Sequence, residues 1–317
     1  MAKAIRDVYG EVLSELGNEN RDIVVLDADL SGSTKTKTFA AAHPERFYNM
    51  GIAESNMVST AAGLSTVGKI PFVNTFTVFL TTLGLIAARG QVCYGNLNVK
   101  FGGAYCGMSD ALDGATHHAL EDISAMRALP NMRLIVPSDE ESTRWATKWA
   151  AENYGPVYLR LSRDVYPDLY PAGYRFEMGK GAVVREGTDV TVIACGLLVH
   201  KAIEAAQAMA EKGISVRVVD MYSIKPLDRE LIIKCAGETG AIVVAEEHSV
   251  YGGLGSAVSE VLAHEGSGAP TELVGVQDTF TETGKYPLLL KKYGLDCDGV
   301  MAAIERAVKR KKRKGIL

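Results

Sequence analysis

The chain has 317 residues and a formal net charge of −4 at pH 7, a length that suits two domains, each with its own hydrophobic core. Six consecutive basic residues, 309–314, supply +6, so the rest of the chain carries −4 − 6 = −10. An acidic body with a short basic end is not the profile of a nucleic-acid-binding protein. We expect the basic end to be a solvated helix terminus.

The five cysteines are widely separated and include no C-x-x-C pair. This spacing argues against a disulfide framework or a zinc site and is typical of a reducing cytoplasm. No signal peptide is apparent, and the most apolar run, 78–88, is too short to span a bilayer. We therefore expect a cytoplasmic protein with no membrane partner.

Helices and strands alternate through the first half of the chain. Apolar positions at helical spacing predict a helix over 8–16 that ends at Gly17-Asn18. Further helices are expected at 56–65 and 120–128, and strands at 23–26, 70–73, 99–101, 134–136 and 157–161. The alternation predicts a mostly parallel sheet with helices on both faces. Such sheets bind ligands at the carboxyl ends of their strands, where the polar loop 27–34 follows the first strand.

A stretch rich in Pro, Tyr, Asp and Gly, 164–181, indicates a linker before a second α/β unit. The expected strands of that unit are 190–194, 216–219 and 241–245, with helices from about His200 and from Asp228, a good N-cap. The glycines of 252–255 open another helix but do not match a dinucleotide fingerprint, so we interpret them as structural. The expected fold class is α/β with two domains, 1–165 and 186–317, joined by a linker at 166–185.

A carboxylate, Glu54, opens the expected helix 56–65, directly after Gly51-Ile52-Ala53. Acidic residues are favoured in first turns by the helix dipole, so a structural role explains Glu54 equally well. Phe76 and Phe79 follow the next strand at i and i+3, a spacing that ordinary core packing also explains. Taken together, the G-I-A-E segment, the A-A-G-L helix and the T-F-x-x-F stretch resemble the pyrimidine-binding domain of transketolase.

The resemblance implies a thiamine diphosphate site. Glu54 would hydrogen-bond the aminopyrimidine ring and activate the cofactor, a role that needs a largely desolvated carboxyl group. Phe76 and Phe79 would form a wall for the ring, with Ile52 and Asp29 as further cofactor-binding residues. The third aromatic position of this wall in the family is Thr82 here, which leaves the wall incomplete.

A second motif, D-G-A-T-H, runs from Asp113 to His117 and is followed by E-D-I-x-x-M-R-x-x-P-N-M. A lone Asp or His before a helix would indicate no more than a helix N-terminus, but the whole pattern closely resembles transketolase. The resemblance implies that Asp113 binds the donor hydroxyl next to the carbonyl. His117 would contact the carbonyl or the first hydroxyl, where an imidazole can exchange protons at neutral pH.

The same resemblance places Arg6, Ser33 and Arg163 around the anionic end of a sugar, where the arginine fork suits phosphate oxygens. Two departures leave the sugar open. Tyr105 stands where the family usually has a phosphate-contacting His, and L-G-L-I-A at 83–87 replaces R-A-[FY]-[ED]-Q. Xylulose 5-phosphate, a pentose phosphate donor, is the default, with a sulfonated ketose or a branched-pentose derivative as the alternative. Arg160 would point to the other strand face and suits the role less well.

No G-D-G segment followed about thirty residues later by Asn is apparent, although thiamine diphosphate enzymes use that pattern to hold Mg²⁺ and the diphosphate. We therefore assign no metal ligand to this chain. The resemblance is to the C-terminal half of a split transketolase, active only with a partner subunit that carries the diphosphate domain and Mg²⁺. An α₂β₂ heterotetramer is expected. Ala61, Ala62 and Gly63 are candidates to line the contact, although burial inside one domain explains them equally well.

Three other readings compete with this hypothesis. The beta subunit of a 2-oxo acid dehydrogenase has the same two domains but lacks D-G-x-T-H. Deoxyxylulose-phosphate synthase has a related motif but is normally one fused chain. A non-catalytic scaffold subunit could use the same fold, but it has no need of Glu54, Asp113, His117 and Arg163 together.

Overall fold

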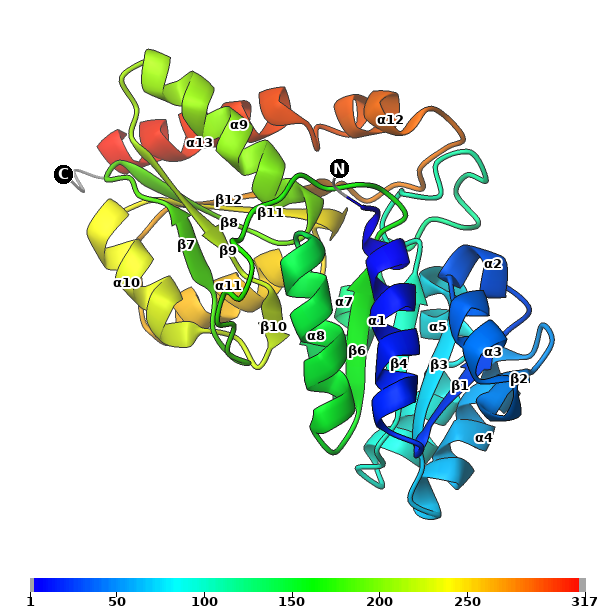
Figure 1. Ribbon diagram of the computed structural model, residues 1–317. Coiled ribbons are helices and arrows are strands. Elements are labelled where there is room, and N and C mark those ends of the chain that lie inside the picture. The colour runs from blue at the N-terminus through cyan, green and yellow to red at the C-terminus, as the bar shows by residue number, and fades with distance from the viewer. Residues whose placement is uncertain (1–2, 314–317) are drawn as a thin grey trace.

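The computed structural model describes residues 3–313, which form two α/β units (Figure 1). The strands of the first sheet are β1 (Ile23–Asp27), β2 (Phe47–Asn49), β3 (Ile70–Phe76), β4 (Lys100–Ala104), β5 (Arg133–Ile135), β6 (Val157–Leu161) and β10 (Ser223–Lys225). Their order across the sheet is β10-β5-β6-β4-β3-β1-β2. Neighbouring strands are parallel except β10, which runs antiparallel to β5. The second half of the chain therefore supplies one edge of the first sheet.

Helices cover both faces of the first sheet. Those of this unit are α1 (Ile5–Glu19), α2 (Ser31–Thr34), α3 (Lys37–Ala42), η1 (Pro44–Arg46), α4 (Glu54–Thr66), α5 (Thr77–Thr82), α6 (Leu85–Ala87), η2 (Ala88–Cys93), α7 (Asp122–Arg127) and α8 (Glu140–Glu152). Alternate residues of β1 belong to the hydrophobic cores on opposite faces of the sheet. Ile23 and Val25 pack in the core with α1 and α8, whereas Val24 and Leu26 pack in the core with α4. Successive side chains of a strand point to opposite faces, which explains this division.

The second sheet has the order β12-β11-β8-β9-β7. Its elements are β7 (Ala182–Arg185), β8 (Val190–Ala194), α9 (Leu197–Glu211), β9 (Val216–Asp220), α10 (Arg229–Thr239), β11 (Ile242–Ser249), α11 (Leu254–His264), β12 (Thr271–Val276), α12 (Tyr286–Lys292) and α13 (Cys297–Arg313). Strand β7 lies antiparallel to β9, and the other pairs are parallel. Strand β7 occupies the last four residues of the segment 166–185, which was expected to be a linker.

Two helix ends were predicted from local residues, and the structure confirms one of them. Asp228 caps α10 as predicted, because its carboxylate accepts a hydrogen bond of 3.0 Å from the Leu231 amide. The prediction that the first helix ends at Gly17-Asn18 is wrong, since α1 continues to Glu19. A Cβ at Gly17 would lie 2.6 Å from Phe39 Cε2. The glycine therefore allows the close approach of α1 to α3 rather than ending the helix.

The glycines before α11 have a packing role. The Glu246 carboxylate accepts hydrogen bonds of 2.7 Å from the amides of Leu254 and Gly255, and so fills the N-terminus of this helix. A Cβ at Gly253 would collide with the same carboxylate. The backbone amides at this glycine turn therefore already bind a side chain of the same domain.

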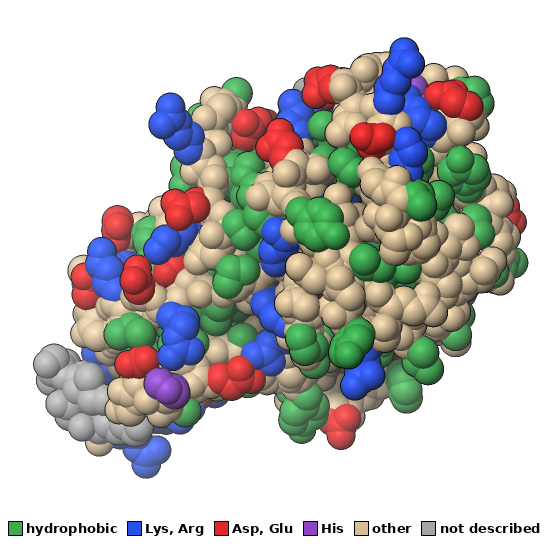
Figure 2. Space-filling view, turned by 90° about the horizontal axis from the view of Figure 1, so that it is seen from below, with side chains coloured by type: hydrophobic (Ala, Val, Ile, Leu, Met, Phe, Trp, Pro, Cys, Tyr) green, Lys and Arg blue, Asp and Glu red, His purple; other side chains and the backbone are tan. Residues whose placement is uncertain are grey.

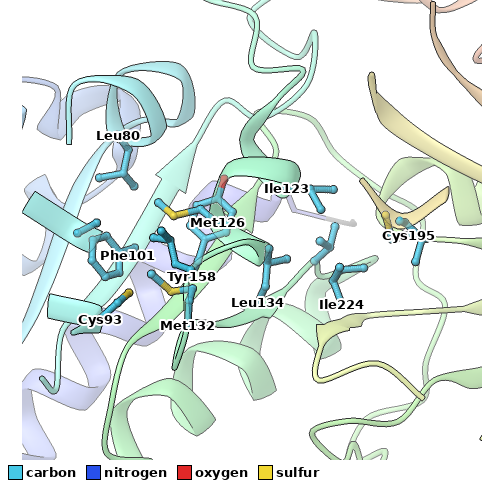
Figure 3. Close-up of a cluster of buried hydrophobic side chains, with 14 of the residues drawn as sticks. Leu80, Cys93, Phe101, Ile123, Met126, Met132, Leu134, Tyr158, Cys195 and Ile224 are labelled. Atoms are coloured by element: carbon cyan, nitrogen blue, oxygen red, sulfur yellow. The ribbon is translucent and has the colours of Figure 1, made fainter. Parts of the chain in front are cut away.

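One hydrophobic cluster continues from the first unit into the second. Figure 3 shows Ile123 and Leu134 beside Cys195 of the second unit and Ile224 of β10, the strand that the second half of the chain adds to the first sheet. Burial of such apolar surface is the main favourable term in folding and in domain association. The two units therefore share part of their core, and the loops between them are held by both.

A buried ion pair lies at the same boundary. The Arg160 side chain is 3% exposed and donates to Asp122 at 2.7 Å, and it also donates to the Glu247 carbonyl at 2.8 Å. This is where the structure places the arginine that we considered less suited to the sugar site.

Within residues 3–313, no helix is long and apolar enough to cross a membrane. The basic end forms the last turn of α13, where Lys309 and Lys312 are exposed and Arg310 pairs with Glu272. Lys314, the last residue of the basic run, lies outside the described residues.

Candidate functional site

The carboxyl ends of β1, β3, β4 and β6 meet at one edge of the first sheet, because these parallel strands are neighbours in it. The segments that follow them carry Asp29, Phe76, Asp113 and Arg163 in turn. The parallel order of the strands therefore gathers residues that are up to 134 positions apart.

Glu54 is the first residue of α4 and is 4% exposed. Its carboxylate accepts a hydrogen bond of 3.5 Å from Thr75 Oγ1 at the end of β3. A carboxylate can accept about four hydrogen bonds, so most of its capacity is free for another donor. Its position at the helix start and its burial together match a group that binds a ligand away from bulk water.

Phe76 and Phe79 lie side by side and form an aromatic wall. Their ring centroids lie 6.1 Å apart with 24° between the ring planes. The His117 ring meets Phe79 edge-on at 5.3 Å, which links the wall to the D-G-A-T-H loop. Thr82 is exposed and donates to the Val78 carbonyl, so no aromatic side chain stands at that position.

Two further expected cofactor residues lie at the surface of the chain. Ile52 is 84% exposed. Asp29 is also exposed, adopts a left-handed backbone with φ of 63°, and accepts a hydrogen bond of 2.8 Å from Asn49. Both side chains are therefore open to solvent in this chain.

The D-G-A-T-H loop presents Asp113 at the surface and leaves His117 half-buried. The Asp113 amide donates to the Asp110 carbonyl at 3.0 Å, which forms the turn that carries it. Thr116 Oγ1 lies 3.0 Å from His117 Nδ1 and orients the imidazole. The loop thus holds a carboxylate and an imidazole beside the aromatic wall.

Two arginines flank Tyr105 at the other end of the site. The Arg6 and Arg163 guanidinium carbons lie 4.9 and 5.3 Å from the centre of its ring. Arg6 donates to the Tyr105 hydroxyl and, at 3.3 Å, to the Ser33 carbonyl. The Phe76 ring centroid is 4.4 Å from that of Tyr105, so the arginine end is continuous with the aromatic wall.

Sequence reasoning missed Asp110, which is 1% exposed and lies 3.4 Å from Arg163 Nη1. Burial raises the pKa of Asp110 to about 6, and the charge and hydrogen bond of Asp113 add to this, while Arg163 and His117 act against it. The only sequence signal was an acidic residue three positions before Asp113.

The second unit supports the D-G-A-T-H loop from behind. Glu247 of β11 accepts hydrogen bonds from the Met108 amide at 2.7 Å and from the Tyr286 hydroxyl at 2.9 Å. His118 Nδ1 lies 2.6 Å from Thr281 Oγ1. The contacts of Met108 and His118 join residues more than 130 positions apart, and no local pattern indicated any of the three.

A cavity of about 470 Å³ opens between this loop and the segment that follows β12. Its lining includes Thr116, Glu121, Asp278 and the exposed Phe280. Within residues 3–313, no group of three or more His, Cys, Asp or Glu side chains is arranged to hold a metal ion.

Two family models match the chain. "Transketolase, pyrimidine binding domain" covers residues 1–168, and "Transketolase, C-terminal domain" covers residues 179–300. The boundary between the two matched regions lies between the two α/β units.

Individual relatives match over nearly the whole chain. The "Putative transketolase C-terminal section" of Methanocaldococcus jannaschii is 43% identical over 97% of this chain and 97% of its own length. The "6-deoxy-6-sulfo-D-fructose transketolase subunit SqwH" of a Clostridium species is 39% identical over 97% of this chain and 95% of its own length. A solved structure, "Split gene transketolase, inactive beta4 tetramer", is 51% identical with a TM-score of 0.88, and the match covers 98% of this chain and 99% of that one.

Proposed function

The chain belongs to the transketolase family, as the pyrimidine-binding and C-terminal domains that make up the C-terminal section of a split transketolase, and from this premise we propose its activity. We propose that it is the subunit of a thiamine-diphosphate-dependent transketolase that moves a two-carbon ketol unit from an anionic ketose to an aldose. The observation that carries the proposal is the run of contacts from His117 through Phe79, Phe76 and Tyr105 to the arginine pair, with the buried Glu54 bonded to Thr75 at the end of the same strand.

The residues present fit the pyrimidine half of thiamine diphosphate. Glu54 offers a buried carboxylate with free acceptor capacity, bonded to Thr75, and the next residue of the strand, Phe76, forms an apolar wall with Phe79. Thiamine diphosphate, when bound, supplies the electron sink for cleaving a carbon–carbon bond next to a carbonyl. Glu54 would hold a proton at the pyrimidine ring, and the wall would keep water from that ring.

The donor sugar would lie between the D-G-A-T-H loop and the arginines. Asp113 would accept a hydrogen bond from the donor hydroxyl next to the carbonyl, while His117 would exchange a proton at the carbonyl oxygen or the first hydroxyl. Arg6 and Arg163 would bind the anionic end from the two sides of Tyr105. We also propose Ser33 as a residue of this anion site, because its carbonyl accepts a hydrogen bond from Arg6.

The chain would complete its site with a partner subunit that holds the diphosphate and Mg²⁺. The support is an apolar surface on α4, α6, η2 and the turns beside them, where five large side chains are exposed. These are Ile52, Val67, Leu83, Ile86 and Tyr94. Exposed apolar surface of this extent is typical of protein–protein contacts, and Figure 2 shows hydrophobic side chains spread over the first unit between few charged ones.

The small residues of α4 are candidates either to line a subunit contact or to be buried inside one domain, and they differ in burial. Ala61 and Ala62 are buried in the core of this chain, as a helix inside one domain requires. Gly63 is exposed, with open space around its Cα, and remains available to a partner. The solved split-gene relative is an inactive beta4 tetramer, which supports self-association without activity when the partner is missing. With the partner, we propose α₂β₂.

Mixing the chain with a diphosphate-domain subunit tests the proposal. The isolated chain should show no ketol transfer and negligible Mg²⁺-dependent affinity for thiamine diphosphate in calorimetry. The mixture should gain both, with a mass by light scattering that matches two copies of each subunit. Tight Mg²⁺-dependent cofactor binding by the isolated chain would show that it contains the missing half-site.

The donor could also be a sulfonated or branched ketose. The support is the Tyr105 hydroxyl, which accepts from Arg6 and can donate its own proton to an anion. The SqwH relative, whose name refers to 6-deoxy-6-sulfo-D-fructose, points in the same direction.

A further inference from the structure

Unpartnered polar atoms concentrate around the donor end of the site. Within residues 3–313, the buried side-chain atoms without a hydrogen-bond partner belong to Arg6, Thr77, Asp110, His118 and Asp164. Buried polar groups in folded proteins are nearly always hydrogen-bonded, so each exception requires an explanation. One of these residues, Arg6, belongs to the arginine pair, and Asp110 and Asp164 lie beside the pair, which indicates that this end is arranged for a ligand rather than for stability.

The charges around the arginine pair are balanced before any donor arrives. Asp110 Oδ1 pairs with Arg163 at 3.4 Å. Burial raises the pKa of Asp164, while the charges of Arg163 and Arg6 act in the opposite direction, which places this carboxyl beside both guanidinium groups. Two carboxyl groups, those of Asp110 and Asp164, thus lie against the two guanidinium groups, and Asp113 lies next to Asp110. The anion end is therefore not a simple cationic pocket.

We propose that Asp110 is a specificity-determining residue of the donor site, which makes the anion end select a head group with one negative charge, such as a sulfonate, over a doubly charged phosphate ester. This inference rests on the proposed function. It names the class of donor for the same site.

The physical basis is electrostatic. Asp110 occupies one side of the Arg163 guanidinium, so a donor meets a cation that is already partly neutralised. A phosphate ester near pH 7 carries about −1.5 to −2 charges, and its second charge is repelled by the buried Asp110 carboxylate behind Arg163. Like charges in such a setting repel more strongly than in bulk water. A sulfonate has one charge and avoids most of this repulsion.

Asp110 reaches this role through Arg163 rather than by touching the donor, because its side chain is 2% exposed. Burial, together with Asp113, raises its pKa to about 6, so the carboxyl is mainly ionised at pH 7.5. The other ionisable groups that face it are His117 of the same loop and His118, whose ring approaches its backbone. The experiment is therefore run at one fixed pH.

The first arm uses the reconstituted enzyme at pH 7.5 with fructose 6-phosphate and 6-deoxy-6-sulfofructose, which differ in the head group. In the wild type, the KM for the phosphate donor should exceed that for the sulfonate by about tenfold, which corresponds to about 1.4 kcal/mol. Asp110→Asn keeps the side-chain shape and should remove this difference by lowering the KM for the phosphate donor. Asp168→Asn, an exposed carboxylate five residues after Arg163, is the matched control and should behave as the wild type.

The second arm needs no ketol transfer, so it separates this inference from the proposed function. The isolated chain is titrated with methyl phosphate and with methanesulfonate, and binding is followed by NMR at the arginine side chains. The wild type should bind methanesulfonate more tightly, and Asp110→Asn should remove this preference by tightening the binding of methyl phosphate. Asp110→Ser serves if the Asn variant fails to fold.

Tighter binding of methyl phosphate by the wild type would overturn the inference. An unchanged preference in both Asp110 variants would do the same. Absence of ketol transfer with both donors in the first arm would instead contradict the proposed function, while the second arm would still decide the role of Asp110.

Discussion

Glu247 offers a quantitative test of how the second unit holds the sugar loop. Its side chain is 2% exposed and accepts hydrogen bonds from the Met108 amide and the Tyr286 hydroxyl. Gly107 makes this contact possible, because a Cβ there would collide with the Glu247 carboxylate. Burial raises the pKa of Glu247 from 4.5 to about 7, although Arg160 and the two hydrogen bonds oppose the shift.

The direction of the pH effect follows from proton linkage. Between pH 4.5 and 7 the folded chain holds a proton at Glu247 that the unfolded chain has lost, so this group lowers stability as pH rises through that window. Each pKa unit corresponds to about 1.4 kcal/mol. A shift from 4.5 to about 7 therefore costs about 3 kcal/mol above pH 7.

Glu247→Gln removes the ionisable group and keeps an acceptor for the Met108 amide. The stability of this variant relative to the wild type should rise by about 3 kcal/mol between pH 4.5 and pH 8. At about 2–4 °C for each kcal/mol, the difference in Tm should grow by about 6–12 °C across that range. Scanning calorimetry at several pH values measures it, with Glu230→Gln, whose side chain is 88% exposed, as the control.

A Tm difference between Glu247→Gln and the wild type that stays constant with pH, or shrinks as pH rises, would refute this reasoning. It would mean that Glu247 titrates alike in the folded and unfolded chains. The same outcome in the Glu230→Gln control is expected and carries no weight against the prediction.

Two further variants test the cofactor residue and the boundary between the units. Glu54→Gln should slow hydrogen–deuterium exchange at the reactive carbon of the cofactor at least about 100-fold in the reconstituted enzyme, and exchange at the wild-type rate would contradict the role of Glu54. Asp122→Ala leaves Arg160 buried and unpaired and should cost about 3–5 kcal/mol in denaturant unfolding. Glu204→Ala, which breaks an exposed pair, should cost at most about 1 kcal/mol, and equal losses for these two variants would argue against a stabilising role of the buried pair.

The amino-acid sequence by itself determined the fold class and the membership of the family. Strands such as 157–161 and 190–194 are short, mainly apolar segments, and the structure confirms both with the same bounds. These features depend on residues close together in the chain, so periodicity and motif spacing are enough to reveal them.

Glycines were less reliable signals, because their reason can lie elsewhere in the fold. Glycine is common at helix ends, but Gly17 instead allows α1 to pack closely against Phe39 of α3. Gly107 likewise makes room for Glu247, a partner 140 positions away. No local pattern distinguishes a glycine that ends a helix from one that makes space for a neighbour.

The tertiary structure alone decided how the donor end is charged. Asp110 meets Arg163 across 53 positions, and Arg6 meets Tyr105 across 99, because parallel strands bring their carboxyl ends to one edge. The sequence shows that these charged and aromatic residues exist, but a motif does not state which arginine is already paired. Electrostatic balance depends on distance and burial in three dimensions, and those are set only when β4, β6 and α1 pack together.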